Sequence, residues 1–182
     1  MLPEILCASG IGMSLGEIGE GSGMKLTAKY DVDAPLDFVF GQLVDFGGWE
    51  RAAMRRGADV MRSDKLREIG PGATWDANFR YRARDRAVTI RLDSLTPQTA
   101  VGLTAISKTV DGVVAMDLLA MGSGRTRFTV RLDVKPKTLA ARIYVQSLRL
   151  ARARVERSFA QRIAQFTAEI EDRYRAAKAA GR

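Results

Sequence analysis

Five segments between residues 73 and 135 alternate between apolar and polar side chains, and short links rich in Gly, Pro, Asp and Ser separate them. Alternation of this kind predicts strands with one buried and one exposed face. The links are shorter than the crossover of about a dozen residues that joins parallel strands, so neighbouring strands are expected to be antiparallel. One link contains Asp111-Gly112, a dipeptide typical of hairpin turns. The segments cover residues 73–81, 87–94, 101–108, 113–121 and 126–135.

Two more strands and two short helices precede this run. Residues 24–32 alternate cleanly, and residues 58–62 form a short strand pattern. Pro35 favours the start of a helix, and the apolar stripe behind it predicts a short helix that ends before the glycine pair at 47–48. A second short helix is expected over residues 49–56.

The C-terminal part of the chain predicts one long amphipathic helix. No Pro or Gly interrupts residues 138–177, although the apolar stripe is less clear before Leu148. Apolar residues at three- and four-residue spacing define a face that must pack against something apolar. They are Val155, Phe159, Ile163, Phe166, Ile170 and Tyr174.

The order of these elements predicts an α+β fold. Its sheet has seven antiparallel strands, with two short helices between the first and second strand. A sheet with one apolar face must cover that face, and only the C-terminal helix is long enough to do so. A strongly curved sheet wrapped around one helix leaves space between the two, with the short helices at the mouth.

Four motifs stand in a recognisable arrangement along residues 24–177. They are the run 32–40, the run 44–46 with Trp49, the turn 70–72 before a strand that carries Trp75, and a closing helix with Phe159 and Phe166. This arrangement resembles the START-like helix-grip superfamily (SRPBCC). That superfamily includes polyketide cyclase/dehydrase, carbon-monoxide-dehydrogenase-accessory and lipid-transport proteins.

The resemblance implies a helix-grip fold whose cavity, between sheet and C-terminal helix, holds a hydrophobic small molecule. A lipid, a quinone or a polyketide-like aromatic would fit this description. The first hypothesis is therefore a binding protein or carrier. A cyclase or dehydratase that uses Tyr81 or a buried carboxylate is the second, and an accessory protein for a membrane-associated complex is the third.

Ten residues are expected to line the cavity, because they are large, mostly apolar and placed on the inward faces. For each, plain core packing is the alternative, and Trp49 could instead staple the short helices together. They are Trp49, Met54, Trp75, Phe79, Tyr81, Met116, Phe128, Val155, Phe159 and Ile163. Arg51, Arg55 and Arg56 could engage a ligand carboxylate or a lipid headgroup, or form a solvated basic face.

The chain contains no histidine and one cysteine, Cys7. The usual general base, the usual metal ligand and the Ser-His and Cys-His nucleophile systems are therefore missing. We assign no catalytic residue and expect neither metal nor cofactor. A single cysteine forms no intrachain disulfide, and no stretch reaches the ~18 apolar residues of a membrane span. A cytoplasmic location is expected.

The net charge is +8, and residues 1–23 carry three acidic and no basic side chains. These residues, which include six glycines, are expected to be a flexible arm or a mis-assigned start, followed by one domain over 24–182. The basic excess favours anionic partners. The aromatic and basic side chains fall on opposite faces of the strands, which argues against nucleic acid. Peripheral contact with an anionic membrane is retained, and the oligomeric state is left open.

Overall fold

The computed structural model describes residues 23–81 and 84–181, without the side chain of Tyr81. The predicted flexible arm therefore lies outside the described residues, apart from Gly23, and stays a prediction. The elements follow the predicted order. They are β1 (Met24–Val32), α2 (Leu36–Val44), α3 (Phe46–Arg55), β2 (Asp59–Arg62), β3 (Thr74–Tyr81), β4 (Arg84–Thr96), β5 (Ala100–Ile106), β6 (Val110–Ala120), β7 (Thr126–Pro136), α4 (Leu139–Leu150) and α5 (Arg152–Ala180).

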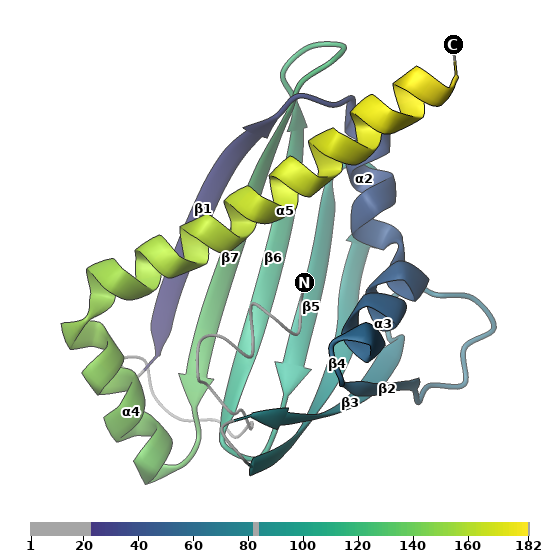
Figure 1. Ribbon diagram of the computed structural model, residues 1–182. Helices are drawn as coiled ribbons and strands as arrows, with labels where there is room; N and C mark the ends of the chain where they lie inside the picture. Colours follow the sequence, from purple (N-terminus) through teal and green to yellow (C-terminus); the bar gives the residue numbers. More distant parts are fainter. Residues whose placement is uncertain (1–22, 82–83, 182) are drawn as a thin grey trace.

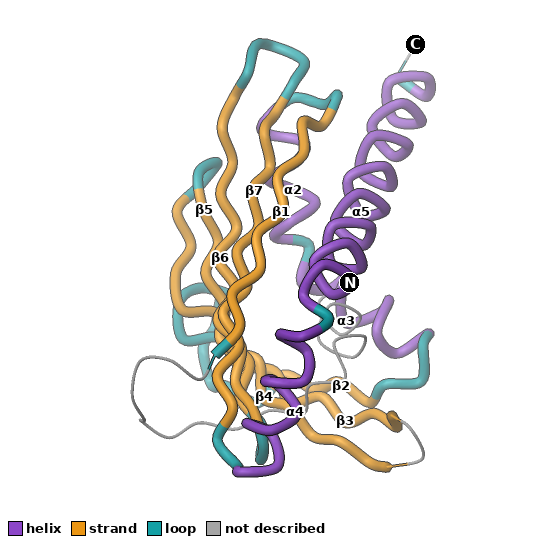
Figure 2. Tube along the Cα trace, turned by 90° about the vertical axis from the view of Figure 1, so that its left-hand side faces the viewer, coloured by secondary structure: helices purple, strands orange, loops and turns teal. Residues whose placement is uncertain are grey.

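The strands form one seven-stranded sheet in the order β1-β7-β6-β5-β4-β3-β2. Every neighbouring pair is antiparallel, which confirms the predicted α+β helix-grip architecture. Figure 1 shows α5 running diagonally across one face of this sheet, with α2 and α3 beside it. In the side view of Figure 2 the sheet and the helices form two layers, and β2 and β3 curl under the helices.

The apolar stripe of α5 packs on the sheet as its spacing predicts. Phe159, Ile163, Phe166 and Ile170 are buried in the core shared by sheet and helix. The Tyr30 hydroxyl of β1 donates a hydrogen bond of 2.9 Å to the carbonyl oxygen of Ala160. The sheet thus contacts α5 through both apolar packing and a polar contact.

The predicted single helix over 138–177 is wrong in one respect, because the helix is broken at Ala151 into α4 and α5. Ala151 has φ −101° and ψ 24°, outside the helical region. Residues 149–154 are exposed, so no buried side chain holds a straight helix there. The break turns α4 so that Ala141 and Val145 are buried while α5 crosses the sheet.

The glycine pair at 47–48 does not end a helix but lies in the first turn of α3. Asp45 caps this helix, and its Oδ1 accepts a hydrogen bond of 2.9 Å from the Gly48 amide. A Cβ on Gly48 would lie 2.0 Å from Asp45 Oδ2, so any other residue here would push the Asp45 carboxylate out of its capping position. The cap therefore outweighs the low helix propensity of the two glycines.

Asp111-Gly112 also departs from its predicted role as a hairpin turn. Both residues lie inside β6, where Gly112 pairs with Ala105 and Val134. Asp111 is buried, and its Oδ1 lies 3.8 Å from Lys137 Nζ. Burial raises the pKa of this carboxyl, while the charge of Lys137 opposes the rise.

Across the described residues, no helix combines the length and apolar character that crossing a membrane requires.

Candidate functional site

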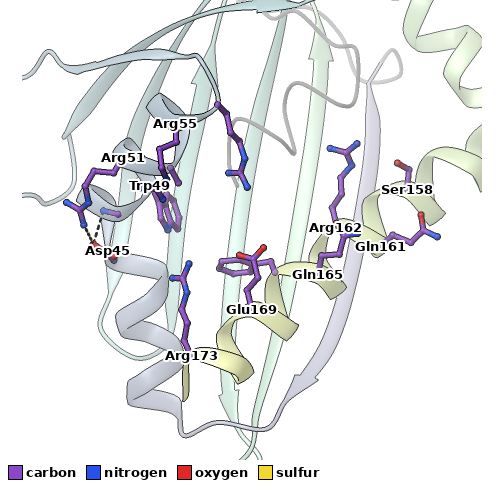
Figure 3. Close-up of a pocket in the computed structure, with 14 residues that line it drawn as sticks. Asp45, Trp49, Arg51, Arg55, Ser158, Gln161, Arg162, Gln165, Glu169 and Arg173 are labelled. Carbon is purple, nitrogen blue, oxygen red and sulfur yellow. Dashed lines mark hydrogen bonds and ion pairs between the residues drawn. The ribbon is translucent and has the colours of Figure 1, made fainter. Parts of the chain in front are cut away.

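A pocket of about 600 Å³ lies between α3 and α5. Figure 3 shows side chains of α5, among them Arg162, Glu169 and Arg173, rising into the space beside α3. The lining residues are Asp45, Gly48, Trp49, Arg51, Ala52, Arg55, Arg56, Ser158, Gln161, Arg162, Gln165, Phe166, Glu169 and Arg173. The sequence predicted an apolar cavity between the sheet and the C-terminal helix, whereas this pocket lies between two helices and most of its side chains are polar or charged. The two helices turn their polar flanks toward each other here.

Positive charge predominates in this α3–α5 pocket. Five arginines line it, against the two carboxylates of Asp45 and Glu169. Arg51 lies 3.9 Å from Asp45, and both side chains are largely exposed, so this pair is weak. Arg173 Nη1 donates a hydrogen bond of 2.9 Å to Gln42 Oε1, which ties α5 to α2.

A second, apolar pocket of about 40 Å³ lies beneath α3, between this helix and the sheet. Trp49 lines both pockets and therefore stands between them. The apolar pocket is lined by Phe46, Trp49, Glu50, Ala53, Val60, Trp75, Ala77, Ile90 and Leu103. Its volume is close to that of one water molecule, so it does not hold an organic ligand unless its walls move.

Three aromatic rings hold α3 on the sheet. Phe46 stacks on Trp75 with ring centroids 5.1 Å apart, and it meets Trp49 edge to face at 5.5 Å. Trp75 Nε1 donates a hydrogen bond of 2.5 Å to Glu50 Oε1 of α3. Trp49 Nε1 donates a longer bond of 3.3 Å to the Gln42 carbonyl oxygen. Both tryptophans of the chain therefore lie at this site.

Of the ten residues expected to line the cavity, Trp49 and Trp75 line a pocket. Phe79 and Val155 are half-buried against the core, and the side chain of Tyr81 lies outside the described part of the chain. Four are fully packed in the core and line neither pocket, namely Met116, Phe128, Phe159 and Ile163. For these four the structure favours the alternative, core packing.

Met54 departs furthest from its predicted place. Its side chain is 47% exposed and lines neither pocket. The neighbouring Ala53 is buried and lines the apolar pocket, and successive residues of a helix point about 100° apart. Met54 is therefore turned away from the sheet.

Sequence reasoning missed the polar half of the site, which lies mainly on α5. Arg162, Gln165, Glu169 and Arg173 recur at three- and four-residue spacing, directly beside the apolar stripe. This second periodicity was available in the sequence, but a polar helix flank looks the same whether it faces solvent or a pocket. Arg51, Arg55 and Arg56 were singled out and do line the α3–α5 pocket.

One ionisable side chain stands among the described residues that line the apolar pocket. Glu50 is the ionisable side chain of the apolar pocket, and it is engaged by the Trp75 indole. No three His, Cys, Asp or Glu side chains within residues 23–81 and 84–181 come together as a metal site.

Solved structures with the same fold are known, although no family profile matches this sequence and no curated protein matches it. The Zhui aromatase/cyclase from a Streptomyces species has a TM-score of 0.58 at 16% identity, covering 85% of this chain and 98% of its own. Norcoclaurine synthase from Thalictrum flavum has a TM-score of 0.53 at 10% identity, and the match covers 82% of this chain and 98% of that one. A START superfamily protein from Mycobacterium smegmatis has a TM-score of 0.50 at 10% identity, and the match covers 75% of this chain and 97% of that one. The chain therefore has the START-like helix-grip fold.

The Trp75–Glu50 hydrogen bond predicts a measurable contribution to stability. Trp75→Phe keeps a ring against Phe46 but removes the donor to a carboxylate, which should cost about 1–2 kcal/mol of unfolding free energy. Trp49→Phe is the matched control, because the hydrogen bond that Trp49 donates is longer and its acceptor is a neutral carbonyl group. This substitution should cost less than about 1 kcal/mol of unfolding free energy. Urea unfolding followed by circular dichroism measures both, and equal losses would contradict the assignment.

Proposed function

We propose that this protein binds a hydrophobic small molecule between α3, α5 and the sheet, as a carrier or sensor. The observation that supports this most is the pair of pockets that share Trp49, one apolar beneath α3 and one open between α3 and α5. Displacement of α3 or rotation of Trp49 joins them into one space. Burial of apolar ligand surface then supplies about 25 cal/mol per Å², less the ordering costs of binding.

A cyclase or dehydratase remains the alternative proposal. The observation in its favour is Glu50, whose carboxylate lines the apolar pocket beside the place where a ligand would lie. A general acid or base at that position needs a pKa suited to proton transfer and a reacting atom within hydrogen-bond reach. Because no second acid–base group of the described residues lines the apolar pocket, we favour binding over catalysis.

The carrier proposal is tested by filling the apolar pocket. Ala53 is buried there, so Ala53→Leu places its extra carbons in the space and should abolish ligand binding, with a stability change within about 1–3 kcal/mol. The measurement is native mass spectrometry of the purified protein, followed by solvent extraction. A co-purifying apolar molecule in the parent protein that is lost in Ala53→Leu supports the proposal.

The matched control is Ala115→Leu, which makes the same change on β6 at a position that lines neither pocket. Retention of ligand by Ala53→Leu, or equal loss in both variants, would contradict the site. A parent protein that carries nothing, and that binds no member of a panel of lipids, quinones and aromatic polyketides, would overturn the proposal.

Peripheral contact with an anionic membrane is a second candidate function, and α4 supplies the observation. This helix has two apolar faces: Ala141 and Val145 are buried, whereas Leu139, Ile143 and Leu150 on the other side are 73%, 61% and 92% exposed. Residues 134–155 also contain six Lys and Arg and no Asp or Glu. An exposed apolar stripe flanked by basic residues is typical of a helix that lies on anionic lipid.

Replacing Leu139, Ile143 and Leu150 together by Ser should weaken binding to phosphatidylglycerol-rich vesicles about tenfold or more, since three side chains no longer enter the lipid. Binding of the parent protein should fall steeply with salt. Vesicle co-sedimentation measures both effects. A control variant with Leu119 and Met61 replaced by Ser removes exposed apolar side chains elsewhere. Equal loss in that control, or no vesicle binding by the parent, would contradict membrane contact.

A further inference from the structure

We propose that the ligand carries an anionic group, a carboxylate or a phosphate, which the arginines of the α3–α5 pocket hold while its apolar body enters beneath Trp49. This inference rests on the proposed function, because it names the chemistry of the ligand for the same site. Its basis is the composition of the pocket wall, where the arginines outnumber the carboxylates by three.

The positive groups come from both walls of the α3–α5 pocket. Arg51 and Arg55 belong to α3, and Arg162 and Arg173 belong to α5. Figure 3 shows Arg162 and Arg173 directed from α5 into the space beside α3, with Glu169 between them. A guanidinium binds carboxylate or phosphate through two parallel hydrogen bonds, so groups on opposite walls can hold one anion from two sides.

The contacts that two of these arginines make within the protein are weak or neutral. Arg51 meets Asp45 at 3.9 Å with both side chains largely exposed, and Arg173 bonds to the uncharged amide of Gln42. Position at the end of α3, where basic residues favour the helix dipole, accounts for Arg55. It does not account for the two arginines of α5. Arg162 lies well inside this 29-residue helix, and Arg173 lies before its last turn.

The positive pocket and the apolar pocket meet at Trp49, which lines both. One ligand that spans them must therefore be amphipathic, with an apolar or aromatic end toward Trp75 and a negative end toward α5. A wholly apolar ligand would leave its second half against guanidinium groups that it cannot pair, which costs affinity.

Two fluorescent probes that differ by one anionic group test the inference. These are 8-anilino-1-naphthalenesulfonate and N-phenyl-1-naphthylamine, which is the same molecule without the sulfonate. Both are followed by energy transfer from Trp49 and Trp75, the two tryptophans of the chain. At low salt the sulfonate should bind about tenfold more tightly or better, which corresponds to one good charge-assisted contact. Raising the salt concentration should reduce the difference.

Arg162→Gln and Arg173→Gln should each weaken binding of the sulfonate probe about fivefold or more. Binding of the neutral probe should change less than about twofold. Arg154→Gln is the control, since it removes the same charge from an exposed position of α5 outside the pocket. Urea unfolding checks that each variant is folded. Because there are two pocket variants, the test still works if one of them does not fold.

The outcomes separate the inference from the function on which it rests. If neither probe binds, the proposed function fails together with the inference. If both bind equally well, or if Arg154→Gln weakens the sulfonate as much as the pocket variants do, the anion site is overturned and the apolar site stands. Displacement of the sulfonate by 2-naphthoate or by 2-naphthyl phosphate at lower concentration than by 2-naphthol supports the site and identifies the anion. Equal displacement by 2-naphthol overturns it.

Discussion

The packing of α5 on the sheet is the contact on which the rest of the structure depends. Phe166, at the middle of α5, meets Phe128 of β7 with ring centroids 6.0 Å apart, and Tyr174, nearer the C-terminus of the helix, meets Phe38 of α2 at 5.1 Å. These contacts, together with the burial of Ile163, place α5 diagonally over the sheet. Because one helix does not cover a seven-stranded sheet, the area over β3–β5 needs a second cover.

Helix α3 provides that second cover, and it contacts the sheet in a different way. The ring stack of Phe46 on Trp75 and the bond from Trp75 to Glu50 attach the helix to the sheet, yet an apolar pocket remains between them. Under α5, Phe159, Ile163 and Ile170 are buried, whereas an apolar pocket remains under α3. Local stability is low where apolar contacts are incomplete, so α3 is suited to move when a ligand enters.

The succession of strands along the chain and the apolar face of α5 followed from periodicity, because burial on one face determines which residue types alternate, and the antiparallel pairing followed from the short links. Boundaries set by single contacts did not follow. The cap at Asp45 extends α3 through two glycines, and the exposed run around Ala151 lets the helix turn. Pocket residues were the hardest to foresee, since Met116 and Trp75 have the same inward pattern but only Trp75 borders unfilled space.

Amide hydrogen exchange with and without bound N-phenyl-1-naphthylamine tests the central claim most directly. Entry of the probe between α3 and the sheet should slow exchange in α3 and in the turns of α5 that face it, residues 158–173. Exchange in α4 and on the β1–β7 side of the sheet should stay unchanged. Protection of those distant elements alone, or no change in α3 while the probe is bound, would contradict a ligand site at Trp49.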